Sequence, residues 1–151
     1  MSATSRFLAY CIALTWPHVG IADTREDQLR AGLAAMERQH YATAMRAWYD
    51  LAAAGDPQAQ HNIGYLYEEG LGVTQQYDLA MDWYRRAADG GLAEAEHNLG
   101  MMYVEGRGAA KSWAQGLIYF RKASDKGLTE SRYMIALSSV SYTHLTLPTR
   151  L

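Results

Sequence analysis

Apolar residues recur with helical spacing along most of this chain. Ala59, Ile63, Leu66 and Tyr67 lie at positions i, i+4, i+7 and i+8, which places all four on one face of a helix. Residues 80–88 show the same spacing, with alanines on both sides of an aromatic pair. The pattern therefore predicts two amphipathic helices joined by a short loop as the structural unit.

This unit returns at a fixed spacing of 36 residues without a gap. The matching positions hold aromatic, small or glycine residues in two or three successive units. They are Trp48, Tyr84 and Phe120; Gly55, Gly91 and Gly127; Ala59, Ala95 and Ser131; Gly64 and Gly100; Tyr67 and Tyr103; Gly70 and Gly106; and Gly72 and Gly108. So many matches in one register predict a repeat protein, an all-α solenoid of antiparallel helix pairs.

Two of the repeated glycines, Gly64 and Gly100, lie inside predicted helices, where glycine costs about 1 kcal/mol relative to alanine. We therefore expect a neighbouring helix to approach closely at both positions. Gly70 and Gly106 follow the predicted helices and suit the left-handed conformation that ends a helix. Gly116 stands where the repeat has alanine, so replacing it by alanine is expected to raise the melting temperature.

Residues 60–73 and 80–88 resemble one complete unit of the Sel1-like repeat family, which is related to the tetratricopeptide repeats, and residues 96–108 open a second unit. The resemblance covers residues 41–137. It implies an α-solenoid in which the first helix of each unit lines the concave side, and an adaptor role in complex assembly and in envelope or secretion processes. The motif positions that we expect to be structural are Gly64, Tyr67, Gly70, Gly72, Trp83, Tyr84, Gly100, Tyr103, Gly106 and Gly108.

The repeat domain is expected to span residues 23–138. Its predicted parts are a divergent N-terminal cap pair at 24–54, one repeat at 57–90, a second repeat at 93–127 and an incomplete helix at 129–138. Such a cap is expected because the end of a solenoid otherwise leaves apolar surface in water. Inside the domain, Gln76 is a weaker N-cap residue than Ser112 at the equivalent place.

Residues 1–22 show the organisation of a secretory signal peptide. Arg6 precedes an apolar run that is too short to span a bilayer, and small residues at 20–22 suit cleavage before Asp23. The alternative is a short buried helix, which Pro17 would interrupt. Cleavage predicts an exported protein, either periplasmic or secreted.

The residues after Ser138 break the repeat. Positions 139–151 lack a helical period and include Pro148, and they lack the tyrosine and glycines that the spacing predicts. We predict a tail that is not native to the protein, so that the natural chain is longer. The alternative is a genuine disordered terminus.

Composition and motifs argue against several functional classes. The formal net charge is −2 and no basic stripe is present, so we expect no nucleic-acid partner. The single cysteine, Cys11, lies in the predicted signal peptide, and the mature region has no His-Glu-x-x-His, P-loop or Ser-x-x-Lys motif. We therefore predict no enzyme activity, no cofactor and no membrane span in the mature chain.

His61 and His97 are equivalent residues on the first helices of successive repeats. A shared zinc ion would need both rings within about 2.0–2.1 Å of the metal together with further ligands. We expect no metal site and predict a polar groove instead. The residues predicted to line this partner-binding groove are His61, Tyr65, His97, Met101 and Tyr133. The alternative is that Tyr65 and Met101 complete the core.

These features predict a non-catalytic scaffold or adaptor in the cell envelope, which binds a peptide or helix of another protein on the concave repeat surface. The family resemblance leaves an alternative, a fragment of a larger cell-envelope enzyme or a weak penicillin-binding or β-lactamase-like repeat protein. Self-association through the exposed last helix is a third expectation.

Overall fold

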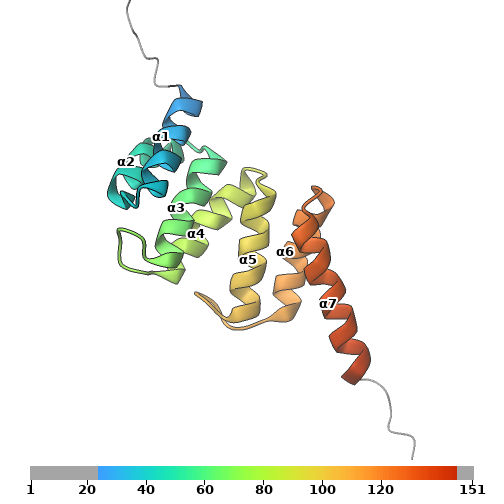
Figure 1. Ribbon diagram of the computed structural model, residues 1–151. Helices are drawn as coiled ribbons and strands as arrows, with labels where there is room; N and C mark the ends of the chain where they lie inside the picture. Colours follow the sequence, from blue (N-terminus) through green and yellow to red (C-terminus); the bar gives the residue numbers. More distant parts are fainter. Residues whose placement is uncertain (1–23, 146–151) are drawn as a thin grey trace, which may run out of the picture.

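The computed structural model describes residues 24–145, and this part of the chain folds into seven helices without a strand (Figure 1). The helices are α1 (Arg25–Glu37), α2 (Tyr41–Ala53), α3 (Pro57–Glu69), α4 (Tyr77–Asp89), α5 (Ala93–Glu105), α6 (Trp113–Asp125) and α7 (Thr129–Leu145). In this range no helix is both long enough and apolar enough to cross a membrane. The predicted all-α solenoid is confirmed.

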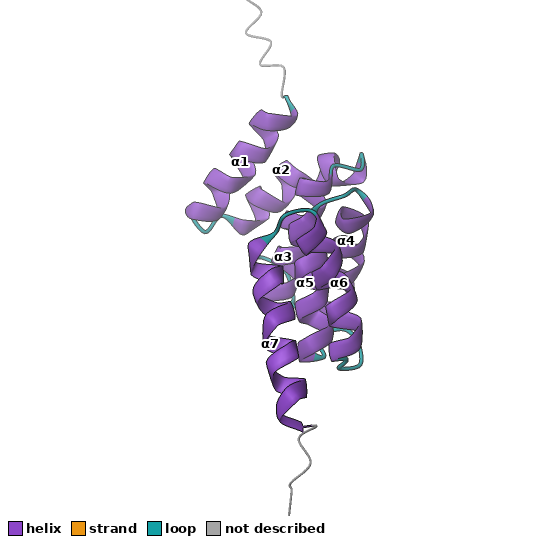
Figure 2. Cartoon of the chain, turned by 90° about the vertical axis from the view of Figure 1, so that its right-hand side faces the viewer, coloured by secondary structure: helices purple, strands orange, loops and turns teal. Residues whose placement is uncertain are grey.

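Each helix packs mainly on its neighbours in the sequence, so the pairs α1–α2, α3–α4 and α5–α6 follow one another along the array (Figure 1). In the view along the array, α7 is nearest and the second helices α4 and α6 lie on one side (Figure 2). The first helices α3, α5 and α7 therefore form a face of their own.

Local sequence signals account for several of the helix ends. The side chains of Thr24, Asp56 and Ser112 accept hydrogen bonds from backbone N–H groups in the first turns of α1, α3 and α6. Gly70 and Gly106 end α3 and α5 in the left-handed conformation, with φ of 67° and 76°. Both glycines therefore end their helices in the left-handed conformation that the sequence predicts.

The two helices of each pair meet at a glycine. A Cβ atom on Gly64 would lie 2.8 Å from the ring of Tyr84, and one on Gly100 would lie 2.5 Å from the ring of Phe120. Both rings are fully buried. The expected close approach at the helical glycines is confirmed, because any side chain there would occupy the space of the aromatic ring.

The first helix pair also meets at a glycine, Gly32. The 36-residue comparison of the sequence does not reveal this contact. A Cβ atom on Gly32 would lie 2.0 Å from Trp48, whose indole N–H donates to the carbonyl of Leu29 at 3.2 Å. The loop between α1 and α2 covers residues 38–40, whereas the later equivalent loop covers residues 70–76. The shorter loop moves Gly32 out of the 36-residue register while it keeps the contact.

Buried alanines and large apolar side chains complete the core. The fully or almost fully buried apolar residues are Ala35, Ala44, Trp48, Ala52, Ala59, Ile63, Leu66, Ala80, Met81, Tyr84, Ala87, Ala95, Leu99, Met102, Phe120 and Ala123. Tyr67, Trp83 and Tyr103 are partly buried and pack against this core. Gly72 and Gly108 sit against Tyr41 and Tyr77, at the starts of α2 and α4. Each glycine loop therefore packs on the helix pair before it.

A buried polar cluster joins the two later pairs. The Tyr84 hydroxyl donates to Glu68 at 2.6 Å, and Arg107, from the loop after α5, donates to the other oxygen of Glu68 at 2.8 Å. Burial and the charge of Glu68 raise the pKa of Tyr84, so its hydroxyl remains a donor. The equivalent positions one repeat later hold the apolar residues Phe120 and Val104.

The last helix extends further than its sequence pattern indicates. We expected it to stop near Ser138, but α7 continues to Leu145, so that boundary is wrong. The final turns extend past the end of α6 (Figure 1), and a helix in that position needs no apolar stripe. The hydroxyls of Ser138 and Ser139 donate to carbonyls three residues earlier, which is compatible with the helix. The predicted signal peptide and residues 146–151 lie outside the described residues.

The contact at Gly116 overturns one expectation. A Cβ atom there would lie 2.9 Å from the backbone carbonyl oxygen of Gly100 and 2.7 Å from a methyl group of Val104. The backbones of α5 and α6 therefore approach too closely for alanine. The helix propensity that alanine would add cannot be realised without separating the two helices.

We predict that Gly116→Ala lowers the free energy of unfolding by about 1–3 kcal/mol, the usual cost of overpacking a core. Urea denaturation followed by circular dichroism measures the change. Gln115→Ala, at an exposed site on the same helix, is the control and should have little effect. An unchanged or higher stability for Gly116→Ala would show that the contact is not close.

At the start of α4, in contrast to Gly116, we expect a substitution to stabilise the protein. Gln76 has φ −146° and ψ 99° and makes no side-chain cap, whereas Ser112, with φ −154° and ψ 106°, caps α6. Since the backbone geometry is nearly the same, Gln76→Ser should raise the free energy of unfolding by about 0.5–1 kcal/mol. Gln76→Ala is the control without an acceptor. Equal stability of the two variants would contradict the capping explanation.

Candidate functional site

His61 and His97 occupy the same place on α3 and α5, and each contacts the aromatic ring that fills the glycine contact. The ring of His61 lies 5.4 Å from that of Tyr84, and the ring of His97 lies 5.3 Å from that of Phe120. Both histidines are half-buried. The packing that joins the helices of a pair therefore also supports the two histidines.

Each histidine forms a hydrogen bond to the first helix of the next repeat. The side-chain N–H of Asn98 donates to Nε2 of His61 at 3.0 Å, so Asn98 joins adjacent repeats. Nδ1 of His97 and the hydroxyl of Ser131 are 2.8 Å apart. The partner changes because α7 has Met134 at the place of Asn98. Two different contacts thus link successive first helices.

A hollow of about 370 Å³ lies on the face formed by α3, α5 and α7. Its lining residues are His61, Tyr65, Glu94, His97, Asn98, Leu128 and Glu130. We call this hollow the groove. It falls within the size range of binding pockets, about 300–1,000 Å³, and it combines apolar, aromatic and acidic side chains.

The groove contains three of the five predicted residues. His61, Tyr65 and His97 line it, whereas Met101 and Tyr133 do not. Tyr65 is 41% exposed and therefore does not complete the core, while Met101 is half-buried. Tyr133 is 64% exposed on α7.

The sequence interpretation missed the acidic part of the groove. Glu94 and Glu130 lie at the same repeat position as Gln58, each 36 residues after the previous one. Comparing charged residues as well as apolar residues in the repeat register would have found them. Leu128, in the loop before α7, adds an apolar wall.

Burial determines the charge of the two histidines. It lowers the pKa of His61, and the nearby Asn62 and Glu94 oppose this shift only in part. Burial also lowers the pKa of His97, against the opposing charge of Glu130. Both rings are therefore neutral at pH 7. Because Nε2 of His61 accepts from Asn98, the proton lies on Nδ1, which is buried and has no hydrogen-bond partner among the described residues.

The donor groups for a metal site do not come together. Among residues 24–145, no group of three or more histidine, cysteine, aspartate or glutamate side chains is placed to hold a metal ion. One nitrogen of each groove histidine already takes part in a hydrogen bond.

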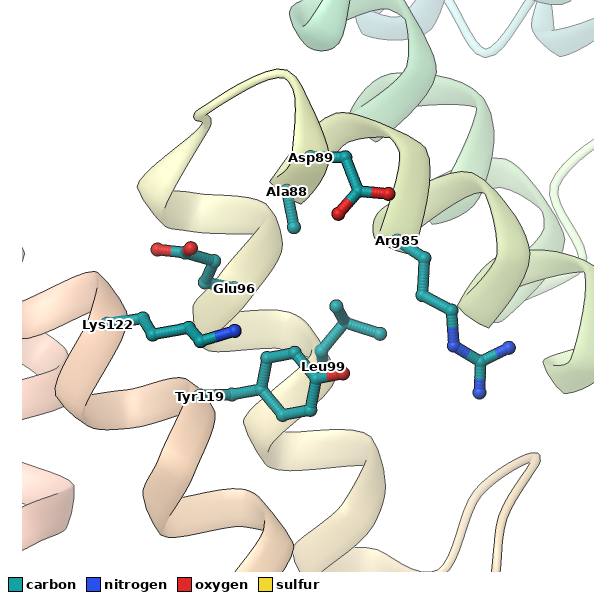
Figure 3. Close-up of a pocket in the computed structure, with 7 residues that line it drawn as sticks. All are labelled: Arg85, Ala88, Asp89, Glu96, Leu99, Tyr119 and Lys122. Atoms are coloured by element: carbon teal, nitrogen blue, oxygen red, sulfur yellow. The ribbon is translucent and has the colours of Figure 1, made fainter.

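A second pocket, of about 400 Å³, lies between α4, α5 and α6 (Figure 3). Asp89, Tyr119 and Lys122 point into its open space, while the head group of Arg85 turns outward. Glu96 also lines the pocket and is only 5% exposed. Its carboxylate pairs at 2.9 Å with Lys126, which is not a lining residue. The lining therefore mixes charges of both signs. It contains no serine, cysteine or histidine that would act as a nucleophile or its base.

Comparison with known proteins agrees with this geometry. The family model described as Sel1 repeat matches residues 57–92 and 93–128. The fold resembles the crystal structure of a Sel1 repeat protein from Oxalobacter formigenes, with 33% identity and a TM-score of 0.69 over 73% of this chain and 45% of that chain. It also resembles a protective antigen of uropathogenic Escherichia coli strains that displays an SLR fold, with 30% identity and a TM-score of 0.66.

The second match covers 70% of this chain and 24% of that chain, so the present chain spans less than half of either solved structure. No curated protein matches the chain. The two matched repeats coincide with the helix pairs α3–α4 and α5–α6, each with its buried glycine contact. The repeats and the fold together identify residues 57–128 as two Sel1 repeats in a solenoid that resembles the SLR fold.

Proposed function

We propose that this protein is a non-catalytic interaction scaffold of the cell envelope, which binds a peptide or helix of another protein in the groove. The observation that carries the proposal is the groove itself, which combines aromatic, apolar and hydrogen-bonding side chains from three first helices. Tyrosine is a typical anchor at protein interfaces, because it buries a large area and keeps a polar group. The Sel1 repeats and the SLR-fold neighbours support an interaction scaffold.

The envelope location rests on the predicted signal peptide at residues 1–22. Fractionation of cells that produce the full chain, followed by N-terminal sequencing of the product, tests this part separately. Cleavage before Asp23 is the expected result. An intact N-terminus on a cytoplasmic product would contradict the location without affecting the groove.

A peptide-display experiment tests the groove. Random short peptides are selected on the immobilised full chain, and their affinity is measured by fluorescence anisotropy. The variant Tyr65→Ala should bind selected peptides about tenfold more weakly, since Tyr65 is 41% exposed and lines the groove.

Tyr49→Ala is the matched control, because Tyr49 is 54% exposed on α2, away from the groove. Its affinity should equal that of the unmodified chain, and thermal denaturation should show that all variants fold. Failure to select any peptide would contradict the proposed function. Selected peptides that bind Tyr65→Ala as tightly as the unmodified chain would contradict the groove as their site.

A further inference from the structure

Two glutamates without an ion-pair partner line the groove. Glu94 lies in the first turn of α5, Glu130 lies in the first turn of α7, and both line the groove. Neither takes part in any of the seven ion-pair contacts within residues 24–145. Two carboxylates therefore face the same hollow without a cation.

The histidines do not supply the missing positive charge. Glu94 acts on His61 across the gap between α3 and α5, and Glu130 acts on His97 across the next gap. Both rings are neutral at pH 7, for the reason given above. Lys126, the basic residue of the loop before α7, is already paired with Glu96. The groove therefore has two negative charges at neutral pH.

The remaining lining suits an extended chain that carries basic side chains. Tyr65 and Leu128 offer apolar contact for the methylene stems of lysine or arginine. A nucleic acid would be repelled by the same two carboxylates.

We propose that the groove recognises an extended cationic segment of a partner protein, with lysine or arginine side chains paired to Glu94 and Glu130. This inference rests on the proposed function and names the chemistry of the partner. Alternate side chains of an extended chain are about 6.5–7 Å apart on one side of the chain, and a lysine side chain is long and flexible. We therefore expect basic residues at alternate positions of the segment to pair with the two glutamates.

The display experiment with random short peptides also tests this inference. The selected peptides should be enriched in lysine and arginine at alternate positions. A labelled peptide from this set should bind the double variant Glu94→Gln and Glu130→Gln about three- to tenfold more weakly, because two partly exposed ion pairs are lost. Asp50→Asn and Asp125→Asn together form the charge-matched control, since both sites are exposed on second helices.

The outcomes separate the two proposals. Two results would contradict a cationic partner but not the groove as the binding site. One is selected peptides that depend on Tyr65 and lack basic residues; the other is peptides whose affinity the two glutamine substitutions do not change. The absence of any selected peptide would overturn both. Equal losses in the glutamine variant and in the control would mean that only the overall charge of the protein attracts the peptide, which also overturns the inference.

The pH dependence gives an independent test. The groups that face the groove are His61 from α3, Glu94 and His97 from α5, and Glu130 from α7. As the pH falls from 7.5 through 6.5 and below the lowered pKa of each histidine, the rings gain protons and place positive charges beside the glutamates. Affinity for a lysine peptide measured at constant ionic strength should therefore fall. A constant or rising affinity over this range would contradict the inference.

Discussion

Contact between a helical glycine and an aromatic ring of the following helix holds each complete helix pair together. The three contacts are Gly32 with Trp48, Gly64 with Tyr84, and Gly100 with Phe120. A glycine inside a helix costs about 1 kcal/mol, whereas an aromatic side chain buries about 150–250 Å². At about 25 cal/mol per Å² the burial outweighs the glycine penalty, so the sequence retains a poor helix former at each of these sites.

The groove depends on the same contact. The rings of Tyr84 and Phe120 lie beside His61 and His97, so the aromatic residue that closes a helix pair also limits where the histidine can turn. The histidine then reaches the next first helix through a hydrogen bond, to Asn98 or to a buried serine of α7. Interior packing, repeat spacing and groove shape are thus parts of one arrangement.

The sequence predicts much of this fold because a repeat presents the same physical problem several times. Gly64 could be interpreted from its cost alone, since an unfavourable residue that recurs needs a packing reason. Gly116 could not, because the separation of two backbones depends on every side chain between them. Gly32 was hidden by a short loop that shifts the register. Glu94 and Glu130 were overlooked because an isolated acidic residue on a helix is usually explained by solvent, and only the structure shows that both face one hollow.

The cluster of Glu68, Tyr84 and Arg107 has a consequence for how such a gene can change. The carboxylate and the phenol belong to one repeat, whereas the guanidinium that neutralises the carboxylate comes from the next. One boundary later, Val104 and Phe120 replace the polar pair. A recombination event that placed the first repeat before a different successor would leave a buried carboxylate without its cation. The repeats therefore look interchangeable in sequence, but their order is physically encoded.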